Sequence, residues 1–137
     1  MKHRASRLIL LLVLGACSGD RAPLIATDVA VSKPKPGMRV AAGYITLSNN
    51  TTETITITRV TSPEFKSVEM HESILEDGIS RMYPLDEVTI PAGQNVAFEP
   101  GGKHLMLMNP TSDADSATLE FYADNVLLLS VNATFAD

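Results

Sequence analysis

The sequence predicts an all-β fold, an antiparallel sandwich or barrel with Greek-key connections. Two observations support this prediction. Roughly eight or nine short runs rich in β-branched and aromatic residues recur along the chain. Gly, Pro, Asn and Asp residues separate these runs, and no stretch has the periodicity of a long amphipathic helix.

The first strands are predicted in the first half of the chain. Val29–Val31 and Arg39–Ser48 are β-rich runs, and the two prolines of Lys33–Gly37 forbid regular pairing between them. Glu53–Val60 alternates threonines with isoleucines, so this strand would have one hydroxylated face and one apolar face.

A β-hairpin is predicted next. Phe65–Ile74 and Ile79–Leu85 flank the turn signal Glu76-Asp77-Gly78. The remaining strands are predicted at Val88–Ile90, Asn95–Phe98, Lys103–Met108, Ala117–Ala123 and Val126–Phe135. Pro- and Gly-containing segments punctuate them, and nothing marks a second domain.

Composition limits the range of functions. The chain has 137 residues, which suits one domain with one core. Three of its 11 Lys and Arg residues lie in the first 16 positions, whereas all 16 Asp and Glu residues follow them. The remainder therefore has 8 basic against 16 acidic residues, a net charge of −8. This balance argues against nucleic acid or an anionic membrane surface as the main partner and is compatible with capture of a cation.

The N-terminal segment is interpreted as an export signal. A basic start precedes the apolar run Leu8–Ala16. This run is too short to span a bilayer, because a membrane-spanning helix needs roughly 20 apolar residues. Leu14-Gly15-Ala16-Cys17 resembles the lipobox of bacterial lipoproteins, which implies lipidation at Cys17. The alternative is an ordinary signal peptide with a chance cysteine. The expected organisation is a signal peptide at 1–16, a lipidated cysteine and tether at 17–26, and a β-domain at 27–137.

The same resemblance predicts where the protein resides. It would be exported and anchored on the periplasmic side of the envelope, and Ser18 after the cysteine would favour the outer membrane in a Gram-negative cell. A single cysteine makes no internal disulfide, so the fold depends on its core.

The hairpin brings a histidine and a methionine together. If Asp77 and Gly78 are the two central turn residues, His71 faces Pro84 and Ser73 faces Met82. His71 and Met82 then lie on one face as diagonal neighbours, with backbones about 7 to 8 Å apart.

A second pair of the same kind lies on one later strand. His104 and Met106 share a face with backbones about 6.6 Å apart, while Leu105 and Leu107 point the opposite way, into the core. Two imidazoles and two thioethers, without thiolate or carboxylate, suit Cu(I) better than Zn, Mg, Ca or Mn. Four protein ligands leave no open position, which favours carrying a metal over catalysis.

Ordinary roles are open for each of these residues and for their neighbours. A lone strand histidine is commonly a surface residue, and methionine is commonly core filler. Met70 is expected in the core, Met108 is either an auxiliary thioether or packing near the site, and the role of Met38 is undetermined. Glu69 and Glu72 either orient a histidine ring or are simply solvated.

The motif as a whole resembles a known family. His71, Met82, His104 and Met106 match the H-x10-M-x21-H-x-M signature of the PCu(A)C copper chaperones, and the similarity covers roughly residues 27–135. The resemblance implies a cupredoxin-like β-barrel that holds one Cu(I) near its surface through these four side chains. It also implies delivery to an acceptor such as the CuA domain of cytochrome c oxidase, with a thioredoxin-like Sco protein as a possible partner.

Two departures from the family modify these expectations. A lipid anchor at Cys17 favours a membrane-tethered donor over a diffusible shuttle. The chain stops at Asp137 without a His/Met-rich tail, so one metal per chain is expected. The alternatives are a copper buffer without a dedicated acceptor and a lipid-anchored β-sandwich that serves as a metal-free interaction or envelope module. An enzyme is disfavoured because the sequence shows neither a Ser-His-Asp order nor a Gly-rich phosphate loop.

Overall fold

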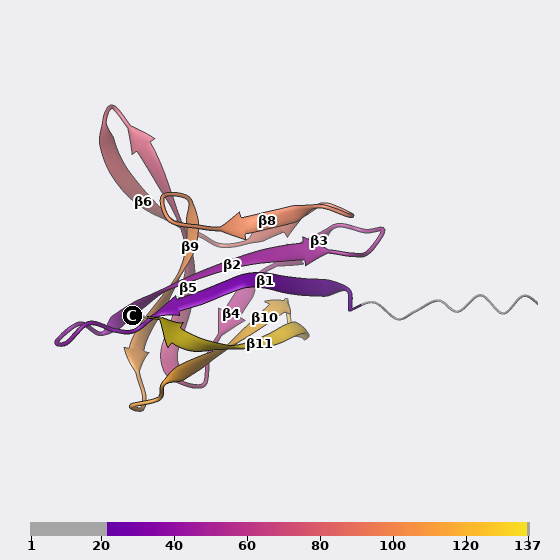
Figure 1. Ribbon diagram of the computed structural model, residues 1–137. Helices are drawn as coiled ribbons and strands as arrows, with labels where there is room; N and C mark the ends of the chain where they lie inside the picture. The colour runs from indigo at the N-terminus through magenta and orange to yellow at the C-terminus, as the bar shows by residue number, and fades with distance from the viewer. Residues whose placement is uncertain (1–21, 137) are drawn as a thin grey trace, which may run out of the picture.

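The computed structural model describes residues 22–136, and within them every regular element is a β-strand (Figure 1). The strands are β1 (Leu24–Ser32), β2 (Val40–Asn49), β3 (Ile55–Ile57), β4 (Arg59–Thr61), β5 (Phe65–Glu76), β6 (Ile79–Leu85), β7 (Val88–Ile90), β8 (Asn95–Phe98), β9 (Lys103–Pro110), β10 (Ser116–Ala123) and β11 (Val126–Ala136). No helix in this part of the chain is long and apolar enough to cross a membrane.

Nine strands form one sheet in the order β4-β10-β11-β1-β2-β8-β9-β5-β6, and β3 pairs with β7 in a small second sheet. β2 pairs with both β8 and β9 along its length. All pairings in the sheets are antiparallel except β1 with β11 and β8 with β9. The predicted all-β, mostly antiparallel fold is confirmed. Strands far apart in the sequence, such as β1 and β11, lie side by side, as in Greek-key folds.

The core follows from strict alternation along the central strands. In β2, every second residue from Ala41 to Asn49 is buried, and in β9 Leu105 and Leu107 are fully buried. The buried apolar side chains form one cluster: Leu24, Val31, Ala41, Ile45, Leu47, Ile57, Val60, Phe65, Met70, Val88, Ile90, Phe98, Leu105, Leu107, Ala117, Leu119, Phe121 and Ala133.

Gly43 allows β2 and β9 to approach closely. It lies opposite Leu105 in the ladder, and a Cβ at this position would lie 3.1 Å from both Leu105 Cβ and Leu107 Cδ1. The absent side chain therefore leaves room for the apolar face of β9. Because that face is packed inward, the alternate residues of β9 face outward.

Most strands end within two residues of the predicted bounds, and the largest differences concern β1 and the Glu53–Val60 segment. β1 begins at Leu24, inside the segment expected to be a tether, because Leu24 is 1% exposed and pairs with Asn49. Glu53–Val60 is not one strand, because β3 pairs with β7 while β4 turns to pair with β10. The predicted signal peptide and the predicted lipidation site at Cys17 lie outside the described residues.

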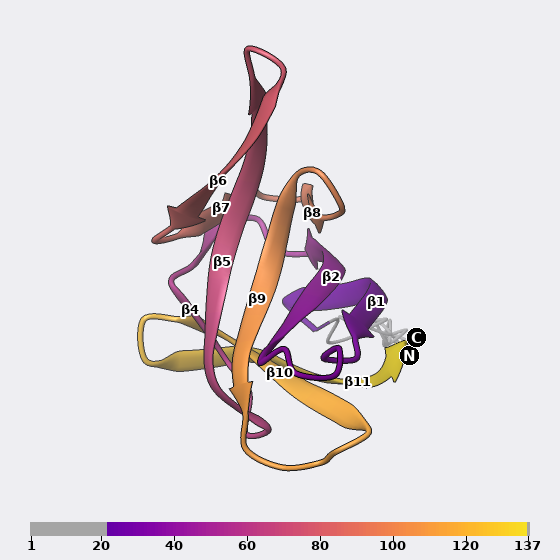
Figure 2. The ribbon, with the colours of Figure 1, turned by 90° about the vertical axis from the view of Figure 1, so that its left-hand side faces the viewer.

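The hairpin of β5 and β6 extends beyond the rest of the domain, and β6 is an edge strand of the large sheet (Figure 2). Its turn residues Asp77 and Gly78 both have positive φ, 51° and 77°, as a two-residue type I′ turn requires. This turn fixes the register with His71 opposite Pro84 and Ser73 opposite Met82, as predicted.

Candidate metal centre

Three adjacent strands position the four predicted metal ligands. β9 lies beside β5, and β5 lies beside β6. His71 on β5 is therefore directly opposite His104 on β9. It is also a diagonal neighbour of Met82 on β6, which is opposite Ser73. Met106 follows two residues after His104 on the same face. The other face of these strands carries buried core side chains, so the two histidines and two methionines share the outer face.

The side chains converge. His104 Nε2 lies 3.4 Å from Met82 Sδ, and the rings of His71 and His104 have centroids 5.9 Å apart with planes tilted by 55°. Met82, His104 and Met106 line one hollow of about 300 Å³, together with residues of the neighbouring strand β2 that include Ala42 and Tyr44. His71 is not among the residues that line this hollow. The structure therefore brings residues from the hairpin and from β9 together, as the sequence predicted.

The partners of His104 determine which nitrogen carries its proton. Nδ1 lies 3.1 Å from the carbonyl oxygen of Gly102, which can only accept a hydrogen bond, so the neutral ring carries its proton on Nδ1. The same carbonyl accepts a hydrogen bond from the Ser73 N–H at 3.0 Å and is thereby held in place. Nε2 then presents a lone pair to Met82 Sδ, which is also an electron-pair donor.

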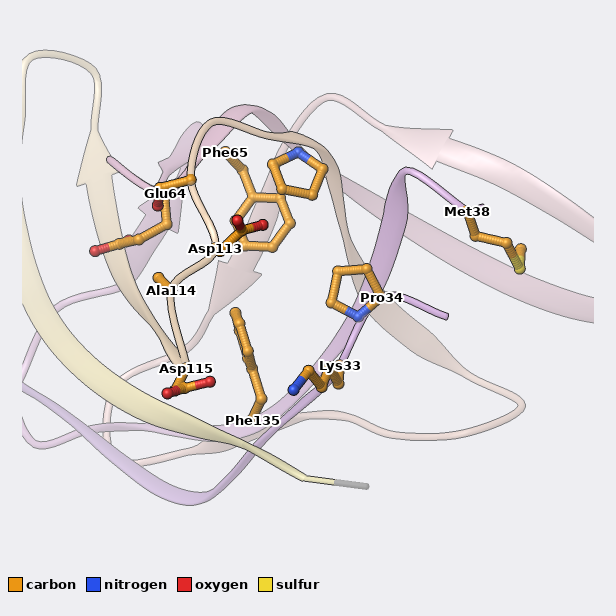
Figure 3. A pocket seen from close by; sticks show the side chains of 11 residues that line it. Lys33, Pro34, Met38, Glu64, Phe65, Asp113, Ala114, Asp115 and Phe135 are labelled. Carbon is orange, nitrogen blue, oxygen red and sulfur yellow. The ribbon is translucent and has the colours of Figure 1, made fainter. Parts of the chain in front are cut away.

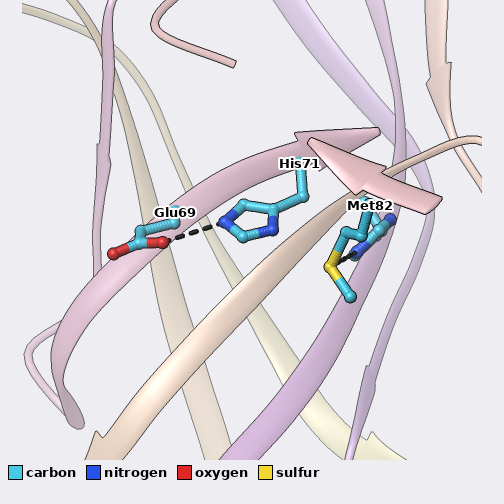
Figure 4. Close-up of polar contacts among 4 residues, drawn as sticks. Glu69, His71 and Met82 are labelled. Atoms are coloured by element: carbon cyan, nitrogen blue, oxygen red, sulfur yellow. Dashed lines mark hydrogen bonds and ion pairs between the residues drawn. The ribbon is translucent and has the colours of Figure 1, made fainter. Parts of the chain in front are cut away.

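The His71 ring is held through its other nitrogen, Nε2 (Figure 4). Its Nε2 lies 2.9 Å from Glu69 Oε2, so Nε2 carries the proton and donates to the carboxylate. Its Nδ1 is buried and has no hydrogen-bond partner among residues 22–136. A buried polar atom without a partner is rare in proteins and is a reason to look for a missing ion.

The donor atoms fit a soft metal ion. His104 Nε2 and Met82 Sδ are 3.4 Å apart, which matches the separation of about 3.5 Å for an imidazole and a sulfur on one tetrahedral metal ion. Met106 lines the same hollow, and the His71 ring lies next to the His104 ring. Within residues 22–136, no group of three or more His, Cys, Asp or Glu side chains is arranged to hold a metal. A centre at this place therefore needs its thioethers, which soft Cu(I) accepts.

Comparison with known proteins places the chain in a family. The family model described as "Putative lipoprotein LpqE-like" matches residues 24–133, most of the chain. The chain belongs to the LpqE-like family.

Two curated proteins are similar in sequence to this LpqE-like chain. An uncharacterized protein of Rickettsia prowazekii (strain Madrid E) is 29% identical over 101 residues, which cover 71% of this chain and 56% of the relative. A protein of Leifsonia xyli subsp. xyli is 31% identical over 87 residues, covering 61% and 52%. The chain thus spans about half the length of the curated relatives it matches.

Solved structures share the fold. The copper-bound PCuAC domain from PmoF2 superposes with a TM-score of 0.66 at 18% identity, over 82% of this chain and 92% of that domain. Apo-DR1885 from Deinococcus radiodurans gives a TM-score of 0.62 at 21% identity, over 100% and 94%. The predicted cupredoxin-like fold of the PCu(A)C type is confirmed for this LpqE-like domain.

The neighbouring residues separate into clear roles in the LpqE-like domain. Met70 is 5% exposed and belongs to the core, as predicted. Met108 is partly buried between Val40 and Ser67 on the flanking strands and does not line the hollow that contains His104.

The two carboxylates near His71 in the sequence have different partners. Glu69 contacts His71, whereas Glu72 lies on the other face and binds Lys103 Nζ at 2.9 Å. The Gly102 carbonyl was not identified from the sequence, because a main-chain acceptor carries no residue-type signal.

Met38 lies away from the centre. Its side chain is 58% exposed and lines a separate cavity of about 470 Å³ (Figure 3). The cavity lies between the Lys33–Met38 loop and the segment after β9, and Phe65 and Phe135 meet edge to face within it, with centroids 6.2 Å apart. Met38 is therefore neither a lining residue of the hollow nor a fifth ligand there.

Proposed function

We propose that this LpqE-like protein is a Cu(I)-binding chaperone of the cell envelope that holds one Cu(I) through His71, Met82, His104 and Met106. The observation that carries the proposal is the 3.4 Å approach of His104 Nε2 to Met82 Sδ, next to the unpartnered Nδ1 of His71. The shared fold with a copper-bound PCuAC domain supports the same metal.

The exposure of the site suits delivery. Met82 is 51% exposed on an edge strand of the protruding hairpin, so an acceptor's ligand can approach the metal from solvent. Thioethers do not titrate and are neutral ligands, so Cu(I) can pass from one ligand set to another without a change in protonation of the sulfur. An enzymatic role is the weaker hypothesis, because four protein ligands leave no position for a substrate.

The proposed setting is the periplasmic side of the envelope, with the domain tethered through lipid on Cys17. The lipobox resemblance and the lipoprotein description of the family support this placement. The proposed acceptor is a CuA domain of cytochrome c oxidase, with a Sco-type protein as a possible collaborator. Replacing Cys17 with serine should release the protein from the membrane fraction; retention in that fraction would contradict the anchor.

The deciding experiment is a Cu(I) titration of the purified protein against a competing chromophoric chelator. We expect one tight equivalent per chain in the wild type and clearly weaker binding in His104→Ala. Unchanged Cu(I) affinity in this variant would overturn the assigned ligands, and no binding in the wild type would leave the metal-free interaction module as the function.

Transfer distinguishes a chaperone from a copper buffer. Cu(I)-loaded protein is mixed with an apo CuA domain, and the metal content of each is measured after separation. We expect the metal to move from the loaded protein to the CuA domain faster than it moves to that domain from a Cu(I)-loaded chelator in a parallel control. Retention of the metal against a tighter CuA site would indicate a buffer.

A further inference from the structure

We infer that Glu69 is a positioning residue of the metal centre, which fixes His71 so that Nδ1 is its metal-binding atom. His104 uses the other nitrogen, Nε2. The inference deepens the proposed function and rests on it for the identity of the metal, although the orientation of His71 can be tested without metal.

The strand geometry places Glu69 beside the centre without making it a ligand. Glu69 and His71 are two residues apart on β5 and share a face, opposite Met106 and His104 respectively. Figure 4 shows the His71 ring between Glu69 and Met82, with the dashed contact to the carboxylate on the side away from Met82. The carboxylate is thus engaged by Nε2 at 2.9 Å, on the outer side of the ring.

The remaining nitrogen follows from the shape of imidazole. The two ring nitrogens diverge, so a ring whose Nε2 donates to Glu69 must direct Nδ1 the opposite way. That Nδ1 is buried and has no hydrogen-bond partner in the part of the chain that the structure describes. The side chain of His71 is 14% exposed, so water has little access to satisfy it. The Glu69 contact therefore keeps a lone pair directed into the protein, where a metal ion would use it.

The two histidines are oriented by chemically different groups. A neutral main-chain carbonyl, that of Gly102, holds His104, whereas a carboxylate holds His71. A hydrogen bond to a carboxylate raises the basicity of a metal-bound imidazole more than a bond to a carbonyl does. His71 is then the stronger nitrogen donor, and the exposed Met82 is the ligand that an acceptor displaces most readily.

Glu72 provides a matched control. It carries the same charge and also lies on β5, next to His71 in sequence, but it is on the opposite face and pairs with Lys103 at 2.9 Å. A general electrostatic effect of a nearby carboxylate would act from both positions. An effect that acts through the His71 ring is confined to Glu69.

The first test reads the ring nitrogens directly. Long-range 1H–15N spectra are recorded at mildly alkaline pH on the 15N-labelled chain carrying Cys17→Ser, first without metal and then with Ag(I) as a stable analogue of Cu(I). We expect His71 protonated on Nε2 in the metal-free protein, and Ag(I) coupling at His71 Nδ1 and His104 Nε2. A His71 ring protonated on Nδ1, or Ag(I) coupling at its Nε2, would overturn the inference.

The second test measures the contribution of Glu69 to affinity. Chelator competition is compared for wild type, Glu69→Ala, Glu69→Gln and Glu72→Ala. We expect Glu69→Ala to weaken Cu(I) binding by about 10- to 100-fold, Glu69→Gln to weaken it less because the amide oxygen can still accept from Nε2, and Glu72→Ala to change it by less than about threefold. Equal losses in the two alanine variants would overturn the positioning role.

The outcomes separate this inference from the proposed function. If the wild type bound no Cu(I) or Ag(I), the proposed function would fail, while the metal-free spectra would still decide the orientation of His71. If the wild type bound Cu(I) and Glu69→Ala bound it equally well, the function would stand and the role of Glu69 would be refuted. The half-exposed Glu69 side chain leaves the core intact when it is truncated, which amide spectra of the variant verify.

Discussion

His104 Nε2 and Met82 Sδ lie 3.4 Å apart, although 22 positions separate them in the chain. Both atoms are electron-pair donors when the His104 proton is on Nδ1, where the Gly102 carbonyl holds it. A cation between these two atoms, or a proton shared by them, would make their approach favourable. The proposed metal centre uses this pair, and the hairpin turn sets the register that places Met82 there.

Met82→Leu should weaken Cu(I) binding by at least about tenfold, because leucine keeps the shape of the side chain but lacks the sulfur. The fold should be retained, since Met82 is 51% exposed. Chelator competition measures the affinity, and circular dichroism checks the fold. Met108→Leu is the matched control, because its thioether lies outside the hollow, and it should bind Cu(I) like the wild type. Equal weakening in both variants would show that Met108 is also a ligand.

His71→Leu should leave the metal-free domain as stable as the wild type, or about 1 kcal/mol more stable. The substitution removes a buried nitrogen that has no partner among residues 22–136, and such an atom costs roughly 1–3 kcal/mol. This gain offsets the loss of the exposed hydrogen bond from His71 Nε2 to Glu69. Urea unfolding measures the free energy. Leu105→Ala, a core truncation on β9, should by contrast lose about 2–5 kcal/mol. A loss in His71→Leu as large as in the core variant would show that His71 is structural.

Gly43→Ala should destabilise the domain by about 1–3 kcal/mol, because the new methyl group would meet Leu105 Cβ and Leu107 Cδ1 at 3.1 Å and force β2 and β9 apart. Thermal unfolding of the metal-free protein measures the loss. Gly102→Ala is the comparison, since its Cβ would meet no atom closer than 3.5 Å, and its loss should be smaller. An unchanged melting temperature in Gly43→Ala would show that β2 and β9 accommodate the methyl group without a loss of stability.

Glu64 should make the domain more stable above pH 4.5 than below it. Partial burial raises the pKa of this carboxyl, but hydrogen bonds from the Thr118 N–H, the Ser62 hydroxyl and other groups outweigh burial and hold the pKa below its usual 4.5. A lowered folded-state pKa gives stability that is present above the unfolded value and is lost as the pH falls through the folded one.

Glu64→Gln tests this pH dependence. The difference in unfolding free energy between wild type and variant should be largest near neutral pH and should shrink as the pH falls below 4.5. Urea titrations over a series of pH values measure it. A difference that stays constant across the series would show that the charge of Glu64 does not contribute.

Much of the centre was predictable because it depends on local rules. A period of two assigns His104 and Met106 to one face and Leu105 to the other, and the Asp77–Gly78 turn fixes the hairpin register, since both residues adopt positive φ. The four-residue motif itself indicated the PCu(A)C type, whose fold the structure confirms. That the four side chains bind copper stays a prediction.

Other features depended on which strands become neighbours, and pairing between distant segments leaves little trace in local sequence. Whether Met38 reaches the site could not be decided before the strands were placed. The same holds for the early start of β1. The contact of Glu69 with His71, by contrast, joins two residues on the same face of one strand and follows from the period of two. The sequence by itself determined the all-β class, the faces of the strands and the hairpin register, because each follows from backbone geometry within a few residues. Only the tertiary structure set β9 against β5 and so brought the two halves of the motif together, because strand pairing is selected by burial of the whole core.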